Sequence, residues 1–170
     1  MHELVLGPLE MTRSTYEQPI PEHFDQNAAR AHFHEGQVGN TKWHVYPEMY
    51  AAGLWTTPTD LAKVAIEVQK SLRSESNKVL SRENVREMVS PVGVGPFAVG
   101  FSIEKKGEGW YFSHGGSNWG FRCYLIAHHV KGYGLAIMTN ASKGSSLARE
   151  YMRRVEKVYK WDTLDEHVRR

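Results

Sequence analysis

Residues 110–139, WYFSHGGSNWGFRCYLIAHHVKGYGLAIMT, decide the fold class of this 170-residue chain. Apolar and aromatic residues gather in three short runs, at 110–113, 121–128 and 133–139, which glycine-containing turns separate. Just upstream, every second residue of 97–103 is apolar. Short runs of this kind joined by tight turns predict antiparallel β-strands.

Helical patterns lie on both sides of this strand region. Thr57 as N-cap, with Pro58 in the first turn, predicts a helix that continues to Leu72. A second, shorter helix is expected within residues 81–90, and a third over residues 145–160. The buried face of the third helix is expected to consist of four apolar residues: Leu147, Tyr151, Val155 and Val158.

The length suits one domain. Residues 1–57 contain scattered prolines and are expected to be rich in loops, with one turn of helix near residues 3–6. Helices follow at 58–90, strands at 97–139 and the last helix at 145–160. This separation of strands from helices predicts an α+β fold, in which an antiparallel sheet packs against helices.

The composition excludes several classes of protein. Hydrophobic residues make up 41% and charged residues 24%, which is typical of a globular domain. A net charge of +2 argues against nucleic acid or a membrane surface as partner. There is no apolar run near the ~18 residues of a membrane span, and no signal peptide is visible. The single cysteine, Cys123, excludes an internal disulfide and is expected to be a buried, inert thiol.

Three short segments occur in a fixed order along the chain. Residues 6–15 read LGPLEMTRST, residues 51–62 read AAGLWTTPTDLA, and residues 114–121 read HGGSNWGF, followed by GLAIMTN at 134–140. Together they resemble the PLGM, GGL…DLA and HGG…GF motifs of the serine β-lactamase and penicillin-binding-protein family. The resemblance is to its class C-like branch, which includes D-Ala-D-Ala carboxypeptidases and esterases. Glu10 stands where that family has a glycine.

The resemblance implies the C-terminal half of a β-lactamase/transpeptidase-like domain, with the HGG strand forming one wall of the active site. Gly115 and Gly116 would let substrate lie against the backbone, and the N–H of Ser117 would be one of two oxyanion donors. His114, in the position of the usual lysine, would bind a substrate carboxylate or orient the general base. The alternative is that its ring bonds a neighbouring loop. Trp119 is the best candidate for lining the cleft.

The family's nucleophile motif is Ser-x-x-Lys at the start of a helix, and no predicted helix of this chain begins with it. The one match, Ser102 to Lys105, lies on an expected strand, where side chains three residues apart point to opposite faces. No Tyr-x-Asn or Ser-x-Asn triplet occurs either. We therefore expect the catalytic serine, lysine and tyrosine to lie outside these 170 residues, and the chain alone to be inactive.

Two functions follow as hypotheses. In the first, the chain is part of a serine hydrolase that transfers an acyl group to water from a β-lactam, a D-Ala-D-Ala peptide or an ester. In the second, it is a non-catalytic binding or structural remnant that associates with itself. In the family, the strand at 133–139 pairs with an N-terminal strand, so here its edge is expected to be open. We expect either a complementing N-terminal chain or a homo-oligomer; a marginally stable fragment is the third outcome.

Nine histidines raise a metal-binding alternative. His32 and His34 lie beside Glu35, and His128 is followed by His129. Neither group fits the His-Glu-x-x-His pattern, so we expect solvated loops, no metal and no cofactor.

Five aromatic residues could belong either to a substrate cleft or to core and loop packing, and Trp119 is the best cleft candidate among them: Trp43, Tyr46, Tyr50, Trp55 and Trp119. The compartment stays open, because members of the family are often periplasmic or exported.

Overall fold

Four antiparallel strands in the order β1-β2-β3-β4 form the centre of the fold, which confirms the predicted α+β class. The computed structural model describes residues 1–33, 37–107 and 109–162. The elements are η1 (His2–Leu6), α1 (Glu22–Asp25), α2 (Met49–Ala52), α3 (Pro58–Leu72), α4 (Arg82–Met88), β1 (Ser102–Lys106), β2 (Gly109–Asn118), β3 (Phe121–His128), β4 (Gly134–Thr139) and α5 (Gly144–Val158). No helix in these described ranges combines the length and apolar character needed to cross a bilayer.

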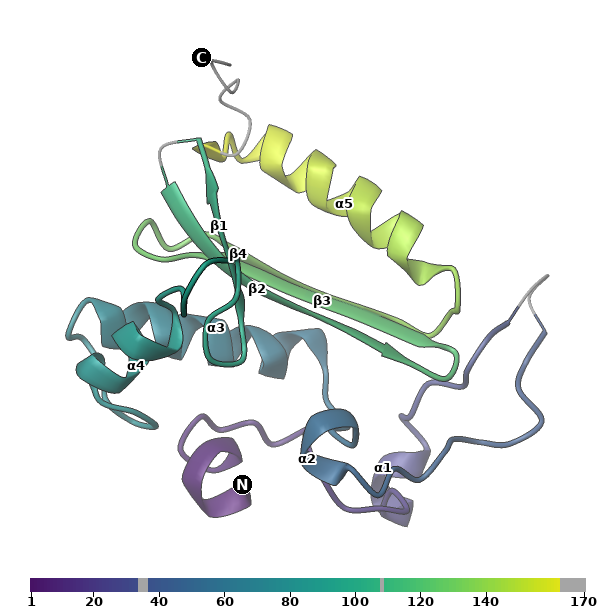
Figure 1. The fold of residues 1–170 in the computed structure, drawn as a ribbon. Coiled ribbons are helices and arrows are strands. Elements are labelled where there is room, and N and C mark those ends of the chain that lie inside the picture. Colours follow the sequence, from purple (N-terminus) through teal and green to yellow (C-terminus); the bar gives the residue numbers. More distant parts are fainter. Residues whose placement is uncertain (34–36, 108, 163–170) are drawn as a thin grey trace.

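The sheet lies between two helical layers (Figure 1). One face carries α5, and the opposite face carries α3 and α4, below which the N-terminal segment runs. Alternate residues of each strand enter the two layers: Phe112 packs toward α3 and α4, and Tyr111 packs toward α5. Burial of each large apolar side chain in these layers stabilises the fold by about 1.5–3 kcal/mol. The apolar layer between the sheet and helices α3 and α4 comprises Ala65, Val68, Val85, Val89, Ile103, Phe112, Leu125 and Ala127.

Side-chain caps fix the starts of α3 and α4 where the sequence predicts them. The Thr57 hydroxyl accepts a hydrogen bond from the backbone N–H of Asp60 at 3.2 Å. The Ser81 hydroxyl accepts one from the N–H of Asn84 at 3.3 Å. Each cap satisfies a backbone donor that the helix itself leaves free.

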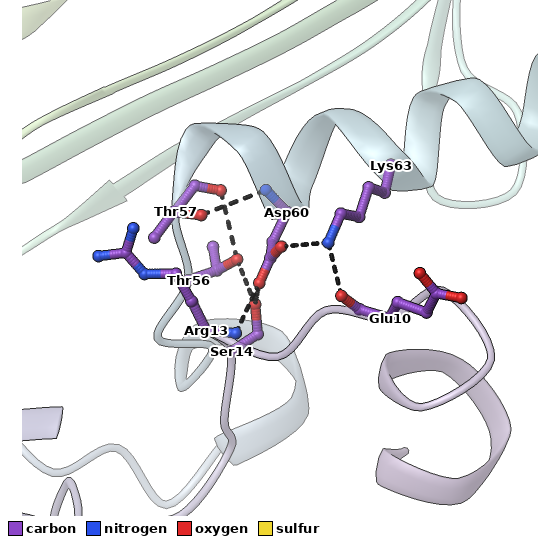
Figure 2. A network of polar contacts seen from close by, with 7 residues as sticks. All are labelled: Glu10, Arg13, Ser14, Thr56, Thr57, Asp60 and Lys63. Atoms are coloured by element: carbon purple, nitrogen blue, oxygen red, sulfur yellow. Dashed lines mark hydrogen bonds and ion pairs between the residues drawn. The ribbon is translucent and has the colours of Figure 1, made fainter. Parts of the chain in front are cut away.

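Asp60 also anchors the N-terminal segment to α3 (Figure 2). Its carboxylate accepts hydrogen bonds from the Arg13 backbone N–H at 2.9 Å and the Ser14 hydroxyl at 2.9 Å. It also pairs with the Lys63 ammonium at 2.8 Å, and Lys63 in turn donates to the Glu10 carbonyl. Burial would raise the pKa of Asp60, but these donors outweigh it and hold the pKa below its usual value.

The predicted strand at 97–103 is wrong in position. β1 begins only at Ser102, and Phe97 and Val99 are exposed. Gly100 has φ +82°, and the Ala98 N–H donates to the Phe101 carbonyl at 2.8 Å. The apolar alternation therefore belongs to a tight turn that folds back on β1.

The predicted buried face of α5 is also wrong. Leu147, Tyr151 and Val158 are exposed, at 65%, 54% and 71%, and only Val155 is partly buried as expected. The first turns of the helix instead approach the sheet through Gly144 and Ala148, and Met152 packs on the core further along. A Cβ atom at position 144 would overlap the Thr139 side chain, so glycine permits this close approach.

The described part of residues 1–57 is rich in loops, as expected, and η1 lies where one turn of helix was predicted; two further short helices, α1 and α2, were not predicted. The Thr15–Trp55 bridge closes this segment on itself, the contacts of Arg13 and Ser14 with Asp60 tie it to α3, and a parallel bridge from His32 to Ala141 ties it to the chain just after β4. The N-terminal third is therefore held against α3 and against the end of β4.

We predict that Asp60→Asn lowers the free energy of unfolding by about 3 kcal/mol, because a buried, charged acceptor of several hydrogen bonds is lost. The depressed pKa means that this stabilisation is complete above the unfolded value of about 3.9 and disappears as the pH falls through the lower folded value. Urea unfolding at a series of pH values measures both effects. Asp25→Asn, at a surface carboxylate paired with Arg30 and Lys42, is the control and should change stability little. Equal losses in the two variants would contradict the role of Asp60.

Candidate functional site

The HGG segment forms the second half of β2, and one side of it is open. β1 pairs with β2 only from Gly109 to Ser113. β3 pairs along the other side of β2 as far as Asn118. Among the described strands, none pairs with the β1 side of residues 114–118, so this half of β2 is a free edge.

The hydrogen-bond pattern shows which backbone groups face that free edge. The His129 N–H donates to the Trp110 carbonyl at 2.9 Å, so the backbone groups of Trp110 face β3. Backbone groups alternate between the two sides of a strand. His114 and Gly116 therefore face β3, and Gly115 and Ser117 direct their N–H and C=O groups to the open side. The expected oxyanion donor, the Ser117 N–H, is on the accessible edge.

The two glycines of the motif have different surroundings. A Cβ atom at position 116 would lie 2.5 Å from Sγ of Cys123, so glycine is required there by the chain's own packing. At position 115 the nearest atom, in Tyr124, would be 3.6 Å away, which is ordinary contact. Cys123 is half-buried rather than buried as predicted, and burial raises the pKa of its thiol despite a backbone hydrogen bond from Gly116.

His114 is exposed. It is two residues after Phe112 on β2, so both side chains lie on the same face of the sheet, the one that carries α3. Its ring makes no hydrogen bond with any residue in the described part of the chain, which gives no support to the alternative that it bonds a neighbouring loop. The ring is therefore accessible beside the free edge.

Trp119, in the turn after β2, is held in a cluster of aromatic rings. Its ring stacks on His44 at 4.2 Å and contacts Phe33 at 4.5 Å between centroids. Its backbone N–H donates to the Tyr46 hydroxyl at 3.2 Å. A depression of about 330 Å³, whose lining includes Trp119, His44 and Phe33, opens beside it.

The other aromatic candidates divide between the two alternatives. Trp43 and Trp55 pack edge-to-face at 5.7 Å, and Trp55 also contacts Phe121 at 5.9 Å, so these residues pack the loops around the turn. Tyr50 is exposed and packs on Tyr16 beside a second depression of about 680 Å³ near the N-terminus.

His128 is not in a solvated loop but is buried in a polar cluster. Its Nδ1 accepts backbone N–H groups of Val130 and Lys131, so the proton resides on Nε2, 3.4 Å from the Asp162 carboxylate. Asp162 also accepts hydrogen bonds from Tyr111 and Lys131. Burial lowers the pKa of His128 against the opposing effect of Asp162, and burial lowers that of His129 to about 4. This cluster joins Asp162, which follows α5, to β2 and to the turn between β3 and β4, and it lies on the α5 side, away from the free edge.

No metal-binding group of three suitable side chains occurs in the described ranges. The His32 Nδ1 lies 2.8 Å from the Arg30 carbonyl and 3.2 Å from Asn140, which is a structural position. His34 and Glu35 lie outside the described residues.

Sequence reasoning missed Phe33 and His44, which pack on Trp119, and Asn118, whose amide donates to the Ala52 carbonyl at 2.7 Å. These partners are separated from the turn by more than 60 residues of sequence. The only signal for them is the density of aromatic residues between positions 33 and 55.

We predict that Gly116→Ala destabilises the chain by about 1–3 kcal/mol, because the new methyl group overlaps the Cys123 sulfur. Gly115→Ala is the matched control and should change the free energy of unfolding little. The double variant Gly116→Ala with Cys123→Ala should recover part of the loss. Chemical denaturation of the four proteins tests the packing, and equal stability of the two single variants would contradict it.

Comparison with solved structures gives the same fold at low sequence identity. The octameric penicillin-binding protein homologue from Pyrococcus abyssi is 20% identical, with a TM-score of 0.65, over 82% of this chain and 32% of its own. SurE is 20% identical, with a TM-score of 0.71, over 91% and 38%. The D-amino acid amidase from Ochrobactrum anthropi SV3 is 17% identical, with a TM-score of 0.64, over 92% and 52%. The chain thus spans about a third to a half of each of these proteins.

Comparison with curated protein sequences finds no match. A family model does match: Beta-lactamase, over residues 1–159. This range includes the open half of β2 and all three segments that resemble the family. The chain therefore belongs to the Beta-lactamase family and has a partial β-lactamase/transpeptidase-like fold.

Proposed function

We propose that this chain supplies the substrate-flanking wall and one oxyanion donor of a β-lactamase-like serine hydrolase. The observation that carries the proposal is the open half of β2, from which Gly115 and Ser117 direct backbone groups outward. A free strand edge binds an extended acyl substrate through main-chain hydrogen bonds.

The chemistry of acyl transfer gives each group a role. As a nucleophile attacks the acyl carbon, negative charge develops on the carbonyl oxygen, and a fixed N–H stabilises it. Ser117 provides this donor on a rigid strand, with the paired β3 behind it. His114, accessible beside the edge, binds a substrate carboxylate or orients the general base. Trp119 and the adjacent depression contact the part of the substrate beyond the strand end.

We propose further that the nucleophile comes from sequence outside these 170 residues. Ser102 pairs with Ser113 and Lys105 with Trp110 in the β1–β2 ladder, so Ser102 and Lys105 lie three residues apart on one strand and point to opposite faces. The Lys105 amine therefore cannot activate the Ser102 hydroxyl. Without another Ser-x-x-Lys, this chain alone forms no acyl-enzyme.

The proposed substrates are β-lactams, D-Ala-D-Ala peptides and esters. Structures named as a penicillin-binding protein homologue, as SurE with D-Leu and as a D-amino acid amidase with D-phenylalanine share the fold. The last two names favour compounds that contain a D-amino acid.

The second candidate is a non-catalytic binding or structural remnant that associates with itself. The observation that favours it is the position of β4, which is an edge strand of the described sheet. An uncovered strand edge promotes association of chains.

We predict that an N-acyl-D-Ala-D-Ala dipeptide shifts the amide signals of Gly115 and Ser117 more than those of His114 and Gly116, which face β3. Titration followed by ¹H–¹⁵N NMR of the whole chain measures this. Ser117→Pro removes the N–H on the open side and should weaken binding, whereas the matched control Ser117→Ala keeps the N–H and should not. Equal affinity of the two variants, or shifts confined to another surface, would refute the role of this edge.

We also predict that a fluorescent penicillin or an aryl ester leaves no covalent label on the purified chain. A denaturing gel and intact mass measure the label, and an acylated serine hydrolase of the family is the positive control. Labelling of this chain that Ser102→Ala abolishes would overturn the assignment of the nucleophile to sequence outside these residues.

A further inference from the structure

We propose that the outer edge of β4 and the exposed stripe of α5, formed by Leu147, Tyr151 and Val158, make a two-fold interface with a second copy of this chain. The interface joins two four-stranded sheets into one. The proposal deepens the second candidate function by naming its partner and register. It does not depend on the role of Ser117.

Two hydrogen bonds show which backbone groups of β4 point to its outer edge. The His128 N–H donates to the Tyr133 carbonyl at 2.9 Å, so His128 and alternate residues of β3 face β4. Their partners in the register, Leu135 and Ile137, therefore face inward, and Gly134, Ala136 and Met138 face outward. The Asn140 carbonyl, next in this series, accepts the His32 N–H at 2.9 Å from outside the sheet, which agrees with this direction.

This edge lacks the features by which edge strands usually resist pairing. GLAIMT at 134–139 contains no charged residue and no proline. His32 covers the strand only beyond its end, at residues 140–142. No described strand pairs with residues 134–138 from outside, so three consecutive outward positions are free for a ladder.

α5 extends this surface into a second layer. Ala148 and Met152 face the sheet. Leu147 comes directly before Ala148 and Tyr151 directly before Met152, so each exposed residue lies about 100° around the helix from its sheet-facing neighbour. α5 follows β4 through a short turn and returns over the sheet (Figure 1). With this direction, the right-handed rotation turns Leu147, Tyr151 and Val158 toward the outer edge of β4 and away from β3.

A second copy fits both layers at once. Three outward residues centred on Ala136 are self-complementary in an antiparallel ladder: Ala136 meets Ala136, and Gly134 meets Met138. A two-fold axis between the strands lies about 2.4 Å beyond β4. α5 packs on both β3 and β4, so its axis lies about 5 Å from the two-fold. The two copies of α5 are then about 10 Å apart, at the upper end of helix packing distances.

We predict that the 170-residue chain is a dimer in sedimentation equilibrium. Ala136→Pro removes an outward N–H, and Leu147→Asp with Tyr151→Asp puts charge on the helix stripe. Each change should raise the dimer dissociation constant by about tenfold or more. Val94→Asp is the matched control, because Val94 is fully exposed on the turn before β1, away from this surface, and it should leave the constant unchanged.

Hydrogen exchange separates this interface from nonspecific association. The N–H groups of Ala136 and Met138 should be protected in the dimer and exchange rapidly in the doubly substituted helix variant, which keeps β4 intact. A chain that stays monomeric at high micromolar concentration would overturn the proposal. So would a dimer whose constant responds equally to Val94→Asp, or one in which these two amides exchange freely.

Discussion

The register between β2 and β3 is the constraint on which the candidate site depends. It runs from Tyr111 opposite His128 to Asn118 opposite Phe121, where the turn containing Trp119 closes the hairpin. Because backbone groups alternate along a strand, a slip by one residue would turn the Ser117 N–H toward β3 and remove it from the open edge. The register is supported from both faces, by Phe112 and Leu125 toward α3 and by Tyr111 and Ile126 toward α5. It also places Gly116 opposite Cys123, where only glycine fits without a shift of the sulfur.

The same sheet has two open edges with different chemistry. The free half of β2 carries glycine, serine and an exposed histidine, so its outward backbone groups are bordered by polar, unobstructed space. The edge of β4 is bordered by alanine, methionine and the apolar stripe of α5. Main-chain groups are equally available on both, and the neighbouring side chains therefore decide what each edge favours. A polar, open edge suits a small acyl substrate, whereas an apolar edge backed by an apolar helix suits another polypeptide.

Much of this architecture could be predicted from the sequence, because local signals agree with the tertiary packing. Thr57 and Ser81 cap helices, and the apolar runs that become β3 and β4 are bounded by turns. Prediction failed where apolar residues occur at the spacing of a strand or of a buried helix face but lie exposed in a turn or on the outside of a helix. Phe97 and Val99 alternate as in a strand but belong to a turn closed by Gly100, whose positive φ the alternation does not reveal. On α5, three of the four residues of the predicted hydrophobic repeat are exposed, because the side that faces the sheet carries Gly144, Ala148 and Met152, and only Val155 belongs to both sets. His128 resembled a loop histidine because its partner, Asp162, is 34 positions away in the sequence.

That failure on α5 bears on how the two proposals relate. A helix stripe that is apolar at regular spacing, yet exposed in the 170-residue chain, is explained when something outside this chain covers it. The family resemblance implies that an N-terminal strand pairs with the strand equivalent to β4, and a second copy would use the same row of backbone groups. The two partners therefore exclude each other at β4, whereas the open half of β2 is available in either state. Formation of the complete domain would then require the dimer to dissociate, so Leu147→Asp with Tyr151→Asp, which leaves the backbone of β4 intact, should assist complementation by an N-terminal half supplied as a separate chain and leave the β2 edge unchanged.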